Sequence, residues 1–194
     1  IQDYQRGIII GQKTFGKGTV QKLDDLSSGQ IKITESKFYR ITGVGMQSKG
    51  IHPDITLPST WDIEEIGESS YKTALPWDEI KPVRFKKFLM EPSLISQLNN
   101  EHFTRVNLSP NLQYILDLRK RYESQKNKEM ISLNLIDRRL EKEERQSWAL
   151  NIENKRRASL NLETFSSFKA MEDFNDVKET EDSEKNLGID IDND

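Results

Sequence analysis

The apolar residues at the start of the chain lie in one short run. Ile8 to Ile10 are consecutive and stand between Gly7 and Gly11. This pattern is typical of a short, fully buried strand with a sharp turn at each end. Residues 1–6 have the pattern of the last turns of a helix, closed by Gly7 in a left-handed cap.

The next residues are strand-like, and residues 30–38 alternate between apolar and polar side chains. Residues 19–26 and 30–38 each have the pattern of a strand, and residues 27–29 between them form a turn signal, so a half-buried hairpin is expected. Residues 51–58 predict a final extended segment. The two prolines in it, Pro53 and Pro58, confine that segment to an edge or an irregular path.

From about Ser93 the apolar spacing becomes helical. Leu94, Ile95 and Leu98 form one short apolar face, and residues 111–127 continue the helical pattern. Residues 131–136 then interrupt it with a short alternating stretch that predicts a strand. Asn134, with Asp137 three residues later, indicates the start of a further helix with an acidic residue in its first turn.

These patterns predict an α+β fold with a β-rich part first and a mainly helical part afterwards. We expect a β-rich piece at residues 1–58, a connector at 59–92, a helical region at 93–169 and an acidic tail at 170–194. In the connector, Trp61, Tyr71 and Trp77 are expected to anchor the segment on a neighbouring surface, because buried aromatic side chains mostly supply apolar area.

Charge changes the picture only at the C-terminal end. The formal net charge is −3, but residues 168–194 hold ten acidic residues against three lysines, and this composition predicts disorder after about Ala170. In residues 119–157 the basic residues are interleaved with acids, so we expect a solvated helix surface and no nucleic-acid partner.

Composition also limits the sites that the chain can form. It has no cysteine, which excludes disulfides and thiolate metal sites, and His52 has no second histidine nearby to complete a metal site. No apolar run approaches the roughly 20 residues of a membrane span.

The most distinctive chemistry lies in a glycine-rich turn that places Lys17 between Gly16 and Gly18. One interpretation is a degenerate P-loop, because Gly11, Gly16 and Lys17 match the opening of G-x-x-x-x-G-K-[ST]. The match fails at Gly18, where a hydroxyl that binds magnesium is needed, and the β-branched Thr19 that follows does not favour a helix. A solvent-exposed loop lysine is the plain alternative, since most lysines are exposed.

Three segments within the first 55 residues, and one in the helical part, resemble a known family. Residues 14–21, Thr-Phe-Gly-Lys-Gly-Thr-Val-Gln, resemble the lysine motif of the tail-specific, or C-terminal processing, serine proteases. Residues 37–43 and 47–55 resemble the strands that follow this motif, and residues 131–152 resemble the family's C-terminal helical region. The resemblance therefore covers most of residues 1–160, with the specific motifs in the first 55.

The resemblance implies roles for three residues. Lys17 takes the place of the general base, Gln21 that of the glutamine that orients it, and Asp3 matches an aspartate that precedes the strand. A lysine accepts a serine proton only in its neutral form, which desolvation favours, and Phe15, Val20 and residues 8–10 could supply apolar surroundings. Ser-Lys arrangements are a recognised variant of the catalytic triad.

The family's serine lies upstream of its lysine, and none of the sixteen residues before Lys17 is a serine. We therefore expect a C-terminal fragment of a serine endopeptidase that is inactive alone. By resemblance, the whole protein needs no metal or cofactor, works in the bacterial periplasm or cell envelope, and cleaves proteins that it recognises through their C-termini. Further cell-envelope partners are compatible with this view. The alternative is a non-catalytic binding or scaffold module in which the helical region is the platform.

Overall fold

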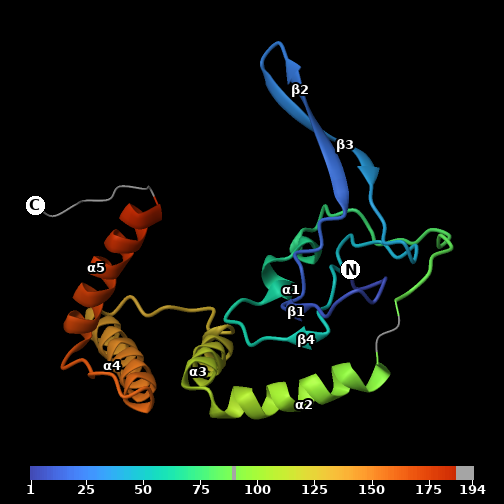
Figure 1. Ribbon diagram of the computed structural model, residues 1–194. Helices are drawn as coiled ribbons and strands as arrows, with labels where there is room; N and C mark the ends of the chain where they lie inside the picture. The colour runs from blue at the N-terminus through green and yellow to red at the C-terminus, as the bar shows by residue number, and fades with distance from the viewer. Residues whose placement is uncertain (89–90, 187–194) are drawn as a thin grey trace, which may run out of the picture. The chain divides into compact units, whose positions relative to one another are not determined.

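The computed structural model describes residues 1–88 and 91–186 and has the α+β fold that the sequence predicts (Figure 1). The chain divides into two compact units, Ile1–Ser109 and Pro110–Asp194. The first unit contains the strands and the second is helical in its described part. The finer boundaries expected at residues 58, 92 and 169 remain predictions.

The first apolar run forms a much shorter strand than expected. Strand β1 (Ile10–Gly11) pairs in parallel with β4 (Ile55–Thr56). Ile55 is buried, whereas Ile10 is 56% exposed, so the prediction of a fully buried strand is wrong for this chain. Among the described residues β1 has β4 as its partner on one side only, and this leaves much of its apolar surface uncovered.

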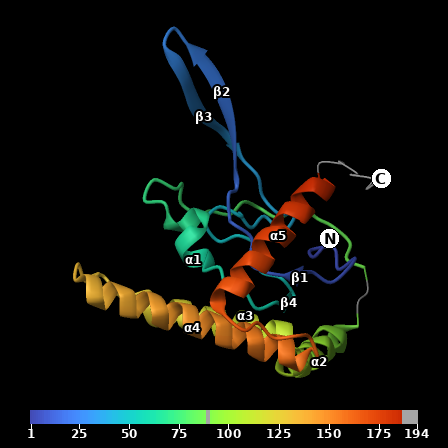
Figure 2. The same ribbon diagram turned by 90° about the vertical axis from the view of Figure 1, so that its left-hand side faces the viewer.

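The predicted hairpin is present. Strands β2 (Thr19–Leu26) and β3 (Gly29–Lys37) are antiparallel, and the two views of the first unit show that they project away from its other elements (Figures 1 and 2). Because the hairpin projects, apolar side chains such as Ile31 and Ile33 are exposed, and the expected half-burial of the hairpin is not observed.

The N-terminal residues form a turn instead of the end of a helix. The amide of Gln5 donates to the carbonyl oxygen of Gln2 at 2.9 Å. The positive φ that was expected at Gly7 occurs at Gln5, with a value of 55°. Residues 1–6 therefore form a local turn. The side chains of Gln2 and Asp3 form hydrogen bonds with residues much later in the chain.

The connector lies against the β-rich residues. It contains the short helices α1 (Ile63–Ile66) and η1 (Glu68–Ser70). The indole nitrogen of Trp77 donates to the carbonyl oxygen of Gly45 at 2.9 Å, and the ring of Tyr71 lies 6.4 Å from that of Phe15. Trp77 thus anchors the connector as expected, whereas Tyr71 contacts Phe15 but is 56% exposed and Trp61 is 67% exposed.

Helix α2 (Pro92–Leu108) packs on β4, close to the predicted position of the first helix. His102 is 3% exposed, and its Nε2 lies 3.1 Å from the carbonyl oxygen of Thr56. Asn99 donates to the carbonyl oxygen of Asp54 at 3.1 Å. Two polar side chains on one face of α2 therefore hold the helix to the strand segment.

The second unit contains α3 (Pro110–Gln125), α4 (Leu135–Ser159) and α5 (Phe168–Asn186). Asn134 caps α4 as predicted, since its side chain accepts from the amide of Ile136 at 2.8 Å. The predicted strand at residues 131–136 does not form, because α4 already begins at Leu135 and the preceding residues pair with no other described segment.

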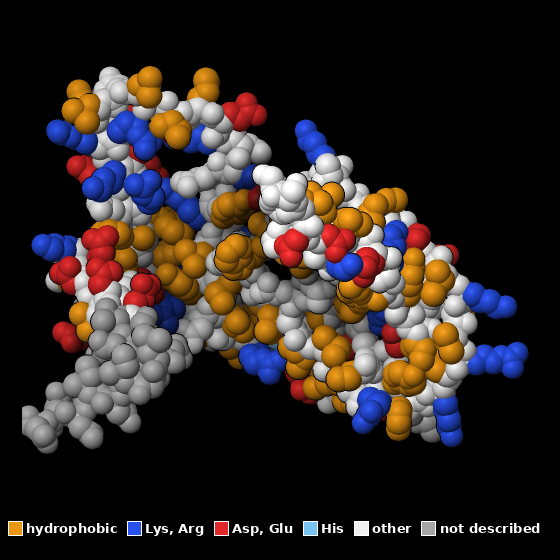
Figure 3. All heavy atoms as spheres, turned by 90° about the horizontal axis from the view of Figure 1, so that it is seen from above, with side chains coloured by type: hydrophobic (Ala, Val, Ile, Leu, Met, Phe, Trp, Pro, Cys, Tyr) orange, Lys and Arg blue, Asp and Glu red, His pale blue; other side chains and the backbone are white. Residues whose placement is uncertain are grey.

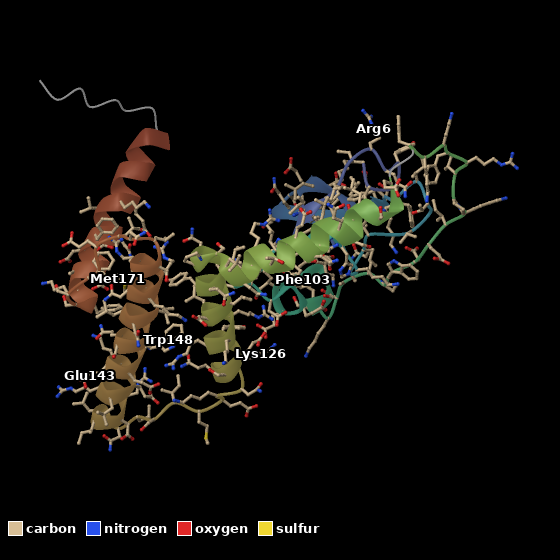
Figure 4. All side chains as sticks on the ribbon, turned by 60° about the horizontal axis from the view of Figure 1, so that its bottom comes forward. Arg6, Phe103, Lys126, Glu143, Trp148 and Met171 are labelled. Atoms are coloured by element: carbon tan, nitrogen blue, oxygen red, sulfur yellow. The ribbon has the colours of Figure 1, made fainter. Side chains whose placement is uncertain are left out.

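Charged and aromatic side chains hold α3 to α4. Arg121 lies over the ring of Trp148 at 5.2 Å, and Arg156 over the ring of Tyr114 at 5.4 Å. Trp148 is labelled on α4 in Figure 4. Glu153, which is buried, accepts from Arg156. These charged side chains therefore pack in the contact between the two helices and do not belong to the solvated surface that was expected.

Helix α5 replaces the predicted disorder over the described part of the tail. Met171 is buried, and Arg157 of α4 lies over the rings of Phe165 and Phe174. These contacts give the first turns of α5 an apolar anchor that the overall acidic composition does not reveal. Residues 187–194, for which disorder was also predicted, lie outside the described residues.

Much of the apolar surface of the chain is accessible. In the space-filling view, hydrophobic side chains lie between charged ones over the visible face (Figure 3). Over the described residues, every helix is too short or too polar to cross a membrane. The described residues also contain no cluster of three or more His, Cys, Asp or Glu side chains suited to a metal ion.

Candidate active site

The lysine turn, defined here as residues 14–18, connects β1 to β2. The amide of Thr14 donates to the carbonyl oxygen of Ile51 at 3.0 Å, and the amide of Ser48 donates to the carbonyl oxygen of Gly16 at 2.8 Å. The turn is therefore held along its length by a segment more than thirty residues later in the chain.

Two glycines make this close approach possible. Gly16 has a φ of +90°, a conformation that residues with a Cβ rarely adopt. A Cβ on Gly50 would lie 2.4 Å from the carbonyl oxygen of Thr14. The turn and the segment facing it thus need glycine for two different reasons, one conformational and one steric.

Lys17 and Gln21 line the same hollow, which has a volume of about 340 Å³. The two residues are four positions apart in a nearly extended chain, and alternate side chains of an extended chain point to the same face. Thr19, between them, lines the hollow as well. Local backbone geometry therefore brings together the two residues that the sequence predicts as base and orienting group.

The polar atoms of the two side chains have threonine partners. The ammonium nitrogen of Lys17 donates to Oγ1 of Thr19 at 3.2 Å, and Thr19 is buried. The side-chain amide of Gln21 donates to Oγ1 of Thr34 on β3 at 3.3 Å. Lys17 itself is exposed, so its ammonium group is accessible to a reacting group in the hollow.

The rest of the hollow combines an apolar wall with charge. The apolar lining comes from Phe15 and from Tyr71, Ala74 and Leu75 of the connector. Of the apolar groups expected near the lysine, Phe15 is in place, whereas Val20 and residues 8–10 are not part of the lining. Lys32 and Glu68 add one cationic and one anionic side chain.

Asp3 is placed differently. Its carboxylate is bound by the guanidinium of Arg40, with Nε of Arg40 at 2.9 Å from one oxygen and Nη2 in contact with the other. Asp3 is not part of the lining of the hollow. The structure thus brings Lys17 and Gln21 together and gives Asp3 an ion pair elsewhere in the same unit.

The P-loop interpretation lacks its structural context. A phosphate-binding loop of this kind opens a helix, whose first amides face the phosphates. Here the lysine turn leads into strand β2, which begins at Thr19. The fold therefore provides no helix N-terminus for a nucleotide at Lys17.

Two residues of the site were not predicted from the sequence. Gln47 is 1% exposed, and its Oε1 accepts from the amide of Gly18 at 2.8 Å. Its Nε2 donates to Oε1 of Glu68 at 2.8 Å. The only sequence signal was that Gln47 begins one of the segments that resemble the protease family; nothing in the local pattern distinguishes Glu68 from its neighbours.

Comparison with known proteins gives matches along the whole chain. Residues 1–57 match the model of Peptidase family S41, and residues 61–193 match the model described as the C-terminal domain of tail specific protease. The tail-specific protease of Haemophilus influenzae is 35% identical over 153 residues, which cover 73% of this chain and 22% of that protein.

Shorter matches cover the first part of the chain. The chloroplastic C-terminal processing peptidase of Tetradesmus obliquus is 38% identical over 58 residues, or 29% of this chain and 12% of that protein. The carboxy-terminal-processing protease of Bartonella bacilliformis is 40% identical over 58 residues, or 29% of this chain and 13% of that protein. This chain therefore spans less than a quarter of the length of each of these relatives.

Proposed function

We propose, because this chain belongs to the tail-specific protease family, that Lys17 is the general base of a serine endopeptidase and that Gln21 orients it. The observation that carries this proposal is the position of both side chains in one hollow, with Thr19 between them. The hollow is open to a reacting group, and the ammonium nitrogen of Lys17 lies beside a hydroxyl at 3.2 Å.

In this mechanism the neutral amine of Lys17 removes the proton of a serine hydroxyl as that hydroxyl attacks the peptide carbonyl carbon. The lysine then donates the proton to the leaving amine. A substrate that covers the hollow would exclude water from the amine of Lys17, and desolvation favours the neutral form that the reaction needs. The apolar wall formed by Phe15, Tyr71 and Leu75 suits such a covered state.

The nucleophile in this proposal is a serine outside the present sequence. The described residues that line the hollow include threonines but no serine, and none of the sixteen residues before Lys17 in this sequence is a serine. We accordingly expect the 194-residue chain by itself to have no peptidase activity. Asp3 would act at a distance, because its bond to Arg40 fixes the turn that precedes β1.

The substrates proposed for the whole protein are polypeptides that it recognises through their C-termini, in the periplasm or cell envelope of a bacterium. The names of the relatives, which refer to tail-specific and C-terminal processing activity, support this substrate class. The proposal needs no metal or cofactor, because the proton transfer and the nucleophilic attack use side chains alone.

The test uses the product of the complete reading frame that contains this sequence, with an unstructured protein as substrate. Lys17→Ala should lower kcat on the order of 10⁴-fold, because the proton acceptor is lost. Lys17→Arg should be equally inactive, since arginine remains protonated at working pH. Lys22→Ala is the matched control, because Lys22 lies on β2 in an exposed pair with Asp24. An active Lys17→Arg enzyme would remove the general-base assignment.

A non-catalytic binding role is the second candidate, and one observation favours it. The segment before α4 exposes Ile131 and Leu133, which are 64% and 98% accessible, respectively. Exposed apolar side chains on an extended segment suit the capture of an unfolded polypeptide. If this role were the whole function, Lys17→Ala would leave binding unchanged and the complete protein would cleave no substrate.

A further inference from the structure

We propose that Gln47 and Glu68 are positioning residues for Lys17, so that the first residues of the segment that matches the C-terminal domain model complete the lysine site of this protein. This inference rests on the proposed function of Lys17. Gln47 lies in the part of the chain that matches the peptidase model, residues 1–57, whereas Glu68 lies in the part that matches the C-terminal domain model, residues 61–193.

Gln47 is suited to connect two different partners. Its side chain is 1% exposed, its Oε1 accepts from the amide of Gly18, and its Nε2 donates to Glu68, each at 2.8 Å. A flipped amide would place an N–H group against the N–H of Gly18 and an oxygen against the carboxylate, so the two partners fix its orientation. The bond to Gly18 is buried and the bond to Glu68 is partly buried, and a missing partner is costly where water cannot replace it.

Glu68 holds the lysine turn at two points. Its backbone amide donates to the carbonyl oxygen of Phe15 at 2.8 Å. Its carboxylate holds Gln47, which in turn holds the amide of Gly18. The two points of attachment stand before and after Lys17 in the sequence, so the backbone that carries the lysine is fixed on both sides.

The lysine turn needs this support because it is intrinsically flexible. Gly16 and Gly18 flank Lys17, and glycine has more backbone freedom to lose than any other residue. A catalytic base that is misplaced by about 1 Å can lose on the order of 100-fold in rate. Fixing the backbone at residues 15 and 18 therefore acts on the rate of proton transfer through the position of Lys17.

The hydrogen bond in which Gln47 donates to Glu68 can be tested in the complete protein by changing the donor or the acceptor. Glu68→Leu removes the acceptor and should lower kcat about 10- to 100-fold. Because Glu68 also lines the hollow, kcat and not KM is the readout of positioning. Glu68→Gln keeps an acceptor oxygen and should stay close to the wild-type rate. Glu79→Leu, an exposed glutamate of the same connector, is the control and should have no effect.

Reversing the polarity tests the pair itself. Q47E alone sets two carboxylates against each other and should lower kcat as much as Glu68→Leu. In the double variant Q47E/E68Q, the carboxylate at position 47 accepts from both Gly18 and the amide at position 68, so most of the lost rate should return. A double variant no faster than Q47E, or an unchanged kcat in Glu68→Leu, would overturn the proposal.

A second measurement on the 194-residue chain does not depend on activity. Glu68→Leu should speed hydrogen exchange at the amide of Gly18 by at least tenfold while circular dichroism stays unchanged. Unchanged exchange at Gly18 would contradict the positioning role. If Lys17→Ala kept full activity while exchange at Gly18 responded as expected, the proposed base would be wrong and the support of the turn would still be shown.

Discussion

Gly18 and Gln47 approach so closely that a Cβ on Gly18 would lie 2.6 Å from the backbone nitrogen of Gln47. A Cβ atom does not come this close to a nitrogen of a distant residue, so one of the two segments would have to move. The contact joins the end of the lysine turn to a segment 29 positions later in the chain. The position of Lys17 therefore depends on the next residue being glycine, because any Cβ at position 18 would clash with Gln47.

Gly18→Ala should destabilise the first unit by about 2 kcal/mol, because overpacking against a fixed backbone costs roughly 1–3 kcal/mol. Gly7→Ala is the matched control, since a Cβ there meets an ordinary contact at 3.4 Å. Urea unfolding of both variants measures the difference. Equal midpoints for Gly18→Ala and the wild-type chain would show that the turn and its partner segment can separate without cost.

Gln21→Ala should be milder than loss of the lysine in the complete protein. We expect kcat to fall by about tenfold to a hundredfold, because the role proposed for Gln21 is to set a geometry that the proposed base, Lys17, can still reach unaided. Gln30→Ala on the same hairpin, whose side chain bonds to Asp25, should leave the rate unchanged. A loss as large as that of Lys17→Ala would mean that Gln21 takes part in the proton transfer.

His102 should be important for the attachment of α2. Its Nδ1 lies 3.1 Å from Nη2 of Arg105 and its Nε2 lies 3.1 Å from the carbonyl oxygen of Thr56. Arginine can only donate, so Nδ1 accepts and the proton of the neutral ring is on Nε2. Long-range nitrogen NMR spectra should show this tautomer; a proton on Nδ1 would contradict the assignment.

The same residue gives a stability prediction. His102→Ala should cost about 2 kcal/mol, because it removes a buried side chain and leaves the carbonyl oxygen of Thr56 without that donor. Phe103→Ala, at the next position of α2 (Figure 4), is the control: Phe103 is 66% exposed, and its loss should change stability by no more than about 0.5 kcal/mol. Denaturant unfolding of the two variants makes the comparison.

Glu141 should titrate below the ordinary glutamate range. The hydrogen bond from Lys128, reinforced by Arg138, lowers the pKa of Glu141. A carboxyl group whose pKa is lower in the folded state stabilises that state at pH values above its unfolded pKa, and this contribution is lost as the pH falls through the folded value. Carbon NMR titration should show the low pKa, and Lys128→Ala should raise it.

The control for this titration is Lys142→Ala, which removes a neighbouring exposed lysine of the same helix. It should leave the pKa of Glu141 lowered. A Glu141 pKa that did not respond to Lys128→Ala would show that the bond at 2.6 Å between these side chains does not persist in solution.

The cap of α4 is the last prediction. Asn134→Ala should destabilise the start of the helix by about 1 kcal/mol, because the side chain accepts from the amide of Ile136. Asn134→Asp keeps the acceptor and should be nearly neutral, and Asn127→Ala in the preceding turn serves as the control. Hydrogen exchange at the first amides of α4 reports the effect, and equal rates in Asn134→Ala and wild type would be inconsistent with the cap.

The sequence by itself determined the elements that depend on local pattern. The hairpin of β2 and β3, the helices α2 to α4 and the cap at Asn134 follow from the spacing of apolar residues and from turn and capping chemistry. The shared face of Lys17 and Gln21 is also local, because two residues four positions apart in an extended chain point the same way.

Only the tertiary structure decided which surfaces meet. In the tertiary structure Gln47 is buried between Gly18 and Glu68. Asp3 forms an ion pair with Arg40, and Tyr71 of the connector lines the hollow. Ile10 is left exposed where its pattern predicts burial. These outcomes depend on contacts between residues far apart in the chain, and local periodicity carries no information about which distant surface, if any, will cover a given side chain.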